Sequence, residues 1–162
     1  MRVSIPIDCP DGHQYLLRFE DFENLPVNID AELGVKVVDI SLISESEVAT
    51  INNIGTLNLI STVVFNFLDE NDVVLYYYCS KDAIYQRKNR KEIPPQQYRS
   101  KLFLTLFDKI VEKYQRGDDY INKPIIIPDE IYGDHYIHFV AESKHSDKLD
   151  KFADYLNKEF EK

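Results

Sequence analysis

An apolar run at residues 73–79 constrains the fold of this chain more than any other stretch. It reads Val-Val-Leu-Tyr-Tyr-Tyr-Cys and is bounded by polar residues on both sides. A short run rich in β-branched and aromatic residues predicts a strand that is buried on both faces. A basic loop follows, and Pro94-Pro95 then lead into a helical pattern over Tyr98–Tyr114, with Gly117 placed to close the helix in a left-handed conformation. This strand, loop and helix form the centre of the predicted fold.

Weaker patterns on either side of this unit predict the remaining elements. Alternating apolar residues indicate two hairpins, and apolar residues at helical spacing indicate two more helices. The expected strands cover residues 2–8, 13–20, 35–43, 73–79, 120–127 and 131–141, and the expected helices cover 56–68, 98–114 and a segment from Ser146. Together they predict an α+β fold, with an antiparallel or mixed sheet of about six strands and three helices largely on one face.

The length and composition predict a single globular domain over residues 1–162. The 44% of hydrophobic residues and 12% of aromatic residues are typical of a chain with a packed core and not of a disordered one. The sequence shows neither a long apolar span nor an N-terminal leader, so we expect a cytoplasmic protein that does not contact membranes. The two cysteines, Cys9 and Cys79, form no ligand-spaced motif and are expected to be reduced thiols.

Three short motifs resemble small uncharacterised bacterial domain families. They are Thr62-Val63-Val64-Phe65 in a predicted helix, Tyr78-Cys79-Ser80 at the end of a predicted strand, and Arg99-Ser100-Lys101-Leu102-Phe103 at the next helix start. Those families share a helix, a strand ending in a small-residue turn, and a helix that begins Arg-Ser/Thr-x-Leu-Phe/Tyr. This chain departs from the pattern in its longer loop between turn and helix. The resemblance covers the middle of the chain and implies the order of elements, with no known activity.

Side chains suited to metal binding or nucleophilic catalysis are few and poorly placed for it. His135 and His138 are the only close histidine pair, and on a strand this spacing sends their rings to opposite faces, which disfavours a metal site. His13 and His145 are expected at the solvated surface. Cys79 follows a buried strand, so we expect a packed thiol and not a nucleophile.

The carboxylates and glycines give no stronger signal for an enzyme. Pairs such as Asp118-Asp119 and Asp129-Glu130 fall in predicted turns, where solvated side chains are the ordinary case. General acid–base catalysis needs two groups in unlike environments, and the five isolated glycines form no phosphate-binding loop. We therefore predict no catalytic residue, no metal and no cofactor. The sequence does not decide whether the protein is an enzyme, but it favours a protein without enzymatic activity.

Charge is distributed unevenly along the chain. The net charge is −9 overall, but residues 73–101 carry seven cationic side chains against two carboxylates, a net +5. Residues 1–72 carry three cationic side chains against thirteen carboxylates, a net −10. An asymmetry of this kind bears on partners and not on the fold.

The basic segment holds the candidate ligand-binding residues. A phosphate group could contact their cationic side chains at the N-terminus of the helix that follows, while the tyrosines offer stacking surfaces. These residues are Arg87, Lys88, Arg90, Lys91, Arg99, Tyr85 and Tyr98. A solvated loop that balances an acidic body is the competing interpretation. The overall negative charge also disfavours binding to long nucleic acids.

The sequence is compatible with two functions. The first is a non-enzymatic module that binds a protein partner, as a bacterial accessory or immunity-type protein does; the acidic residues 1–72 would then complement a basic partner. The alternative is binding of nucleic acid or of a phosphorylated ligand through the basic segment 81–101. The sequence does not indicate the oligomeric state.

Overall fold

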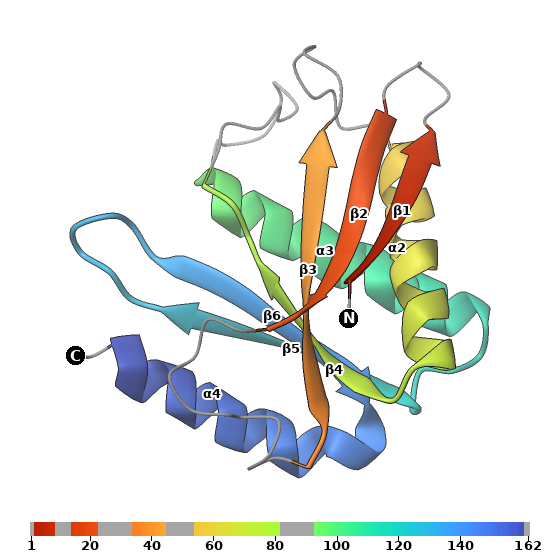
Figure 1. The fold of residues 1–162 in the computed structure, drawn as a ribbon. Coiled ribbons are helices and arrows are strands. Elements are labelled where there is room, and N and C mark those ends of the chain that lie inside the picture. The colour runs from red at the N-terminus through yellow and green to blue at the C-terminus, as the bar shows by residue number, and fades with distance from the viewer. Residues whose placement is uncertain (1, 9–13, 23–33, 45–53, 82–92, 161–162) are drawn as a thin grey trace.

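Strand β4 (Val73–Tyr78) lies inside a six-stranded sheet, as its apolar sequence predicts. The computed structural model describes residues 2–8, 14–22, 34–44, 54–81 and 93–160 (Figure 1). The strand order is β1-β2-β3-β4-β6-β5. The other strands are β1 (Arg2–Asp8), β2 (Gln14–Asp21), β3 (Lys36–Ser44), β5 (Tyr120–Ile127) and β6 (His135–Glu142).

The sheet is mixed because two antiparallel halves meet in one parallel pair. Strands β1, β2 and β3 are antiparallel neighbours, and so are β4, β6 and β5. Strands β3 and β4 pair in parallel, with Lys36 opposite Val73 and Ile40 opposite Tyr77. The chain between them includes helix α2 (Ile54–Glu70), in line with the longer connection that parallel neighbours need. The predicted α+β class with a mixed sheet is confirmed.

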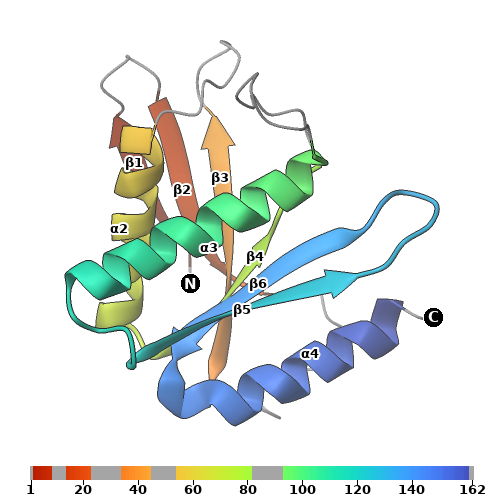
Figure 2. The same cartoon turned by 180° about the vertical axis from the view of Figure 1, so that it is seen from behind.

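The three helices divide between the two faces of the sheet. Helices α2 and α3 (Pro95–Lys113) cover one face (Figure 2), where Phe19, Leu75 and Phe107 belong to the same buried cluster. Helix α4 (Ser146–Phe160) follows the short 3-10 helix η1 (Ser143–His145) and packs on the opposite face with a second buried cluster. Two helices therefore share a face as predicted, and α4 departs from that arrangement.

Helix α3 ends differently from the sequence prediction. The left-handed residue is Gln115, at φ 57°, and not Gly117. The Gln115 N–H donates to the carbonyl of Glu112 at 3.0 Å, and the Arg116 N–H donates to that of Val111 at 2.7 Å. These two bonds form a Schellman motif, which usually places a glycine at the position of Gln115. The helix therefore closes two residues before the glycine.

Strand β6 begins four residues later than its sequence pattern predicts. Residues 131–134 belong to the connection between β5 and β6, and the strand starts at His135. Figures 1 and 2 both show this hairpin extending past the helices, with its connection at the far end. Among the helices of the described residues, none has the length and hydropathy required to cross a membrane.

Candidate functional site

The connection between β5 and β6, residues 128–134, is a tightly hydrogen-bonded turn, hereafter the β5–β6 turn. Its centre is Asp129, whose Oδ1 accepts the backbone N–H groups of Ile131 at 2.9 Å and Tyr132 at 3.0 Å. The Gly133 N–H donates to the Asp129 carbonyl at 3.1 Å, and the Asp129 N–H donates to Asp134 Oδ1 at 3.2 Å. Gly133 has φ 88°, a conformation that favours glycine. The local sequence therefore fixes the path of the turn.

Two side chains from other elements hold the β5–β6 turn from outside. Lys81, just after β4, donates from Nζ to the carbonyls of Tyr132 and Gly133, both at 3.0 Å. Gln96, in the first turn of α3, is buried and donates from Nε2 to the carbonyl of Asp134 at 3.1 Å. The start of α3 and the end of β4 thus anchor a turn that lies far from both in sequence.

A histidine completes the support of Asp129. The Nε2–H of His135 donates to Asp129 Oδ2 at 2.8 Å, and Nδ1 of the same ring is hydrogen-bonded to the Tyr78 hydroxyl at 2.7 Å. The backbone N–H of Tyr132, the bond from His135 and the N–H of Ile131 lower the pKa of Asp129 to about 2. Asp129 is therefore ionised at any physiological pH, and its carboxylate is committed to holding the turn. The prediction that Asp129 lies in a turn is confirmed, but its carboxylate is hydrogen-bonded within the turn and is not an ordinary solvated group.

The β5–β6 turn presents apolar side chains to solvent. Ile131 is 82% exposed and Tyr132 is 76% exposed, more than any other large apolar side chain in the described residues. Ile126 of β5, at 52%, is the next in order. The exposed carboxylates Glu130 and Asp134 flank the pair. The turn can therefore offer a partner a fixed apolar surface with a negative border.

Only part of the predicted ligand-binding segment lies in the described residues. Tyr85, Arg87, Lys88, Arg90 and Lys91 lie outside them, so the structure does not test their assignment. The remaining two lie on α3: Tyr98 is half-buried, and Arg99 donates from Nη1 to the Ser80 carbonyl at 2.8 Å. Arg99 thus connects α3 to the end of β4, at the residue that precedes Lys81.

A second hydrogen-bonded chain joins α3 to the hairpin through Ser100, His138 and Asn122. The Nδ1–H of His138 donates to Asn122 Oδ1 at 2.7 Å, which leaves Nε2 to accept the Ser100 hydroxyl at 2.7 Å. This is the order of nucleophile, base and orienting group in a hydrolase triad. However, His138 is fully buried, and desolvation lowers its pKa to about 4. Ser100 is also buried, so the chain is better suited to satisfying polar groups in the core than to catalysis.

The predictions that the rings of His135 and His138 lie on opposite faces of a strand and that Cys79 is a packed thiol are confirmed. His13 and Cys9 lie outside the described residues. His135 and His138 lie on strand β6 and bond to different partners, one at the turn and one in the core. Cys79 is a buried free thiol, and burial raises its pKa to about 12. A thiol in this state is a poor nucleophile.

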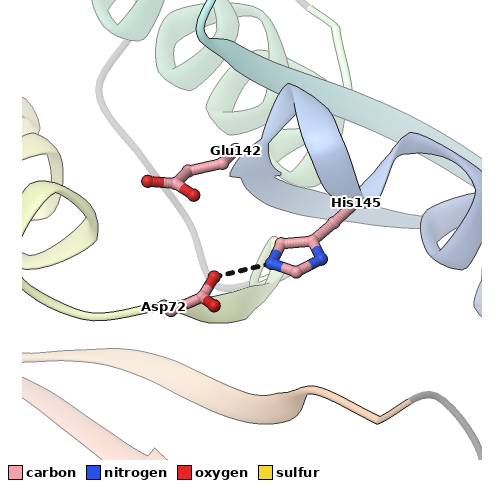
Figure 3. Close-up of side chains that lie close together, drawn as sticks. All are labelled: Asp72, Glu142 and His145. Carbon is pink, nitrogen blue, oxygen red and sulfur yellow. Dashed lines mark hydrogen bonds and ion pairs between the residues drawn. The ribbon is translucent and has the colours of Figure 1, made fainter.

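A cluster of Asp72, Glu142 and His145 lies where the α2–β4 connection meets η1 (Figure 3). His145 Nε2 bonds to Asp72 Oδ1 at 2.6 Å. The Lys144 ammonium bridges the same two carboxylates, at 3.2 Å from Asp72 and 3.0 Å from Glu142. These residue types can ligate a divalent cation, but Lys144 already supplies a positive charge between the carboxylates. The cluster therefore fits an ion-paired clamp between two connections.

The prediction of a solvated His145 was wrong. The side chain is buried, because η1 turns it toward Asp72 at the start of β4. The two residues are 73 positions apart in sequence, so no local pattern could have indicated the contact. The β5–β6 turn did carry a local signal, since Gly133-Asp134 is a turn-forming pair inside the predicted strand.

Comparisons with protein-family models, with curated proteins and with solved structures find no match for this chain.

Proposed function

We propose that this chain is a non-enzymatic module that binds a protein partner through the β5–β6 turn. The observation that carries the proposal is the exposure of Ile131 and Tyr132 on a turn whose backbone is fixed by Asp129, Lys81 and Gln96. Tyrosine is among the side chains that contribute most binding energy at protein interfaces, and burial of an apolar side chain such as isoleucine adds to it. A bacterial accessory or immunity-type protein in the cytoplasm is the setting that the sequence favours.

The rigidity of the turn supports recognition more than it supports folding. Two large apolar side chains in solvent contribute nothing to the core, and burying them in a partner would be favourable. Association normally costs free energy to immobilise loops at an interface. The hydrogen bonds to Asp129 reduce this cost, because they already hold the turn in one conformation in the unbound protein. A turn of this kind is ready to bind without rearrangement.

Two substitutions test this function against a matched control. In Ile131→Ser/Tyr132→Ser the turn keeps its backbone hydrogen bonds and loses its apolar surface. In Leu42→Ser/Leu59→Ser, two exposed apolar side chains on β3 and α2 are changed in the same way. Each tagged chain is expressed in the source cells, cross-linked and recovered, and enriched proteins are identified by mass spectrometry. Their affinity for each purified variant is then titrated by calorimetry.

We expect a protein that is recovered with the wild type and the control but not with the turn variant. Loss of two interface anchors should weaken its purified complex by about 100-fold or more, since single anchors are often worth 2 kcal/mol. Recovery of the same proteins by all three chains, with equal affinities, would contradict the proposed function.

The alternative function, anion binding through the basic segment, has less support from the described residues. Arg99 and Lys81 both donate to backbone carbonyls, which gives them a structural role at the end of β4. A fluorescence titration with short single-stranded RNA and DNA and with common nucleotides at two salt concentrations tests it directly. Binding that is lost in Arg87→Gln/Arg90→Gln/Arg99→Gln would favour this alternative.

A further inference from the structure

We infer that the partner of the β5–β6 turn is a protein whose apolar pocket has a positively charged rim. This inference rests on the proposed function and adds the chemistry of the surface that the turn must meet. It follows from the charges that the turn leaves available to a partner.

The carboxylates and the ammonium group at the turn are not equivalent. The Asp129 carboxylate receives three hydrogen bonds from inside the turn, and the Lys81 ammonium donates to two backbone carbonyls. Within residues 93–160, Glu130 and Asp134 are the exposed charged side chains closest in sequence to Ile131 and Tyr132. Asp134 uses one oxygen, Oδ1, to accept the Asp129 N–H. The border that faces outward is therefore negative.

A negative border selects among the surfaces that could bury an apolar turn. Lysine or arginine residues around the pocket would complement it, accelerate association and exclude acidic competitors. An anionic lipid surface would repel it, although tyrosine side chains are common at membrane interfaces. A partner protein with a basic rim is the occupant that fits both the apolar centre and the charges.

The rigid turn also fixes where those charges lie. Gly133 lies in a left-handed conformation, and a Cβ there would meet Gln96 Nε2 at 3.4 Å. Glu130 precedes the apolar pair and Asp134 follows it on a backbone that is held by hydrogen bonds from within the turn and from Lys81 and Gln96. The cationic groups of the partner should accordingly lie on both sides of its pocket.

The test uses the purified partner recovered in the cross-linking experiment and two pairs of isosteric substitutions. Glu130→Gln/Asp134→Asn removes the border charges but keeps an oxygen acceptor for the Asp129 N–H. The control, Glu70→Gln/Asp154→Asn, removes the same charge from exposed positions on α2 and α4. Affinity and association rate are measured for each chain at low and at high salt.

We expect the wild type and the control to lose affinity as salt rises, because exposed charges are screened. The border variant should bind about ten-fold more weakly at low salt, mainly through a slower association rate, and show a flatter salt dependence. If the border variant binds as the wild type does at both salt concentrations, the charged rim is overturned. The proposed function would still stand in that case, provided that Ile131→Ser/Tyr132→Ser abolishes binding.

Two further measurements address other occupants of the same surface. Sedimentation with phosphatidylcholine vesicles, with and without phosphatidylglycerol, tests a membrane, and light scattering over a range of concentrations tests a second copy of the chain. We expect neither vesicle binding nor self-association that depends on Ile131 and Tyr132. Either result would overturn the inferred partner class.

Discussion

Asp39 occupies an unfavourable place for a charged residue in the middle of β3. It lies opposite Glu20 of β2 on one side and opposite Tyr76 of β4 on the other. Desolvation, followed by the charge of Glu20, raises its pKa to about 6. Glu20 itself is held ionised by hydrogen bonds and ion pairs with Arg2 and Arg18. Asp39 is therefore the member of this carboxylate pair that retains its proton as the pH rises.

Replacement of Asp39 by asparagine should stabilise the protein above pH 6 and have little effect near pH 4. The folded state keeps the proton up to about pH 6, whereas the unfolded chain releases it near 3.8, so wild-type stability falls as pH rises through this window. The gain should be about 1 kcal/mol, because Asp39 is partly exposed and solvent screens the effect.

Urea unfolding of both proteins at pH 4 and at pH 8 measures this difference. His138 acts with the opposite sign in the same window: its pKa falls from 6.5 to about 4 on folding, so its contribution is lost as the pH falls. Because both proteins contain His138, their difference isolates Asp39. An equal gain at the two pH values would refute the assignment of the raised pKa.

Gln115 has a backbone conformation that is unfavourable for a residue with a side chain. At φ 57° it closes the Schellman motif of α3, where glycine has no steric penalty. Gln115→Gly should therefore raise the free energy of unfolding by about 1 kcal/mol. The same substitution at the exposed helix position Lys109 should lower it by a similar amount. Denaturant midpoints that shift in the same direction for both variants would contradict this account.

At the scale of elements, the chain from Ser100 through His138 to Asn122 joins α3 to the β5–β6 hairpin. Ser100→Ala would leave His138 Nε2 without a donor in the core. We expect a loss of about 1–3 kcal/mol in unfolding free energy, which is typical of an unsatisfied buried polar group. Thr105→Ala, at an exposed position on the same helix, should have a much smaller effect. If urea unfolding shows that both variants lose the same free energy of unfolding, the buried hydrogen bond does not contribute more to stability than an exposed side chain does.

Elements with a strong period and clear boundaries were predicted well from the sequence. Residues 73–78 and 120–127 form strands as expected. Their β-branched and aromatic side chains pack well on the pleated, buried surface of a sheet. The predicted start of β6 was wrong because Ile131 and Tyr132 also have side chains that favour strands. Their N–H groups bond instead to Asp129, so local turn chemistry overrode the propensity.

The face on which a helix packs and the contacts between distant residues could not be read from the sequence. Helix α4 has an ordinary amphipathic pattern, and nothing in it specifies which side of the sheet it covers. Likewise, the anchoring of the β5–β6 turn by Lys81 depends on how β4 and α3 are brought together. In the sequence Lys81 is one of seven cationic side chains in residues 73–101, and only the fold shows that it bonds to the turn.

At the scale of the whole molecule, the sheet ends in two edge strands that each contain a proline. Pro6 lies in β1 and Pro124 in β5, and both are exposed. Proline lacks an N–H donor and interrupts the hydrogen-bonding edge that another strand would need. Each edge is therefore a poor template for adding strands from another molecule.

Restoring these donors should cause association through the sheet. With Pro6→Val or Pro124→Val alone, one edge is opened and we expect dimers. With both substitutions, two edges are opened and we expect larger assemblies that increase with concentration. Light scattering coupled to size-exclusion chromatography measures the mass. Monomeric behaviour of the double variant would show that other features, such as twist or charge, protect the edges.

The parallel pair β3–β4 has a consequence for the order in which the protein acquires its structure. On either side of it lie strands that pair with antiparallel neighbours, and the β1–β2 and β5–β6 pairs form between segments close in sequence. Strand β4 can pair with β3 only after the chain through α2 has closed a long loop, and with β6 only after a still longer loop through α3 and β5 has closed. Each closure costs conformational entropy before any contact rewards it. We therefore expect that the pairing of β4 with its two neighbours limits the folding rate, and that Val38→Ala or Leu75→Ala slows folding, measured by stopped-flow refolding, more than substitutions at either edge.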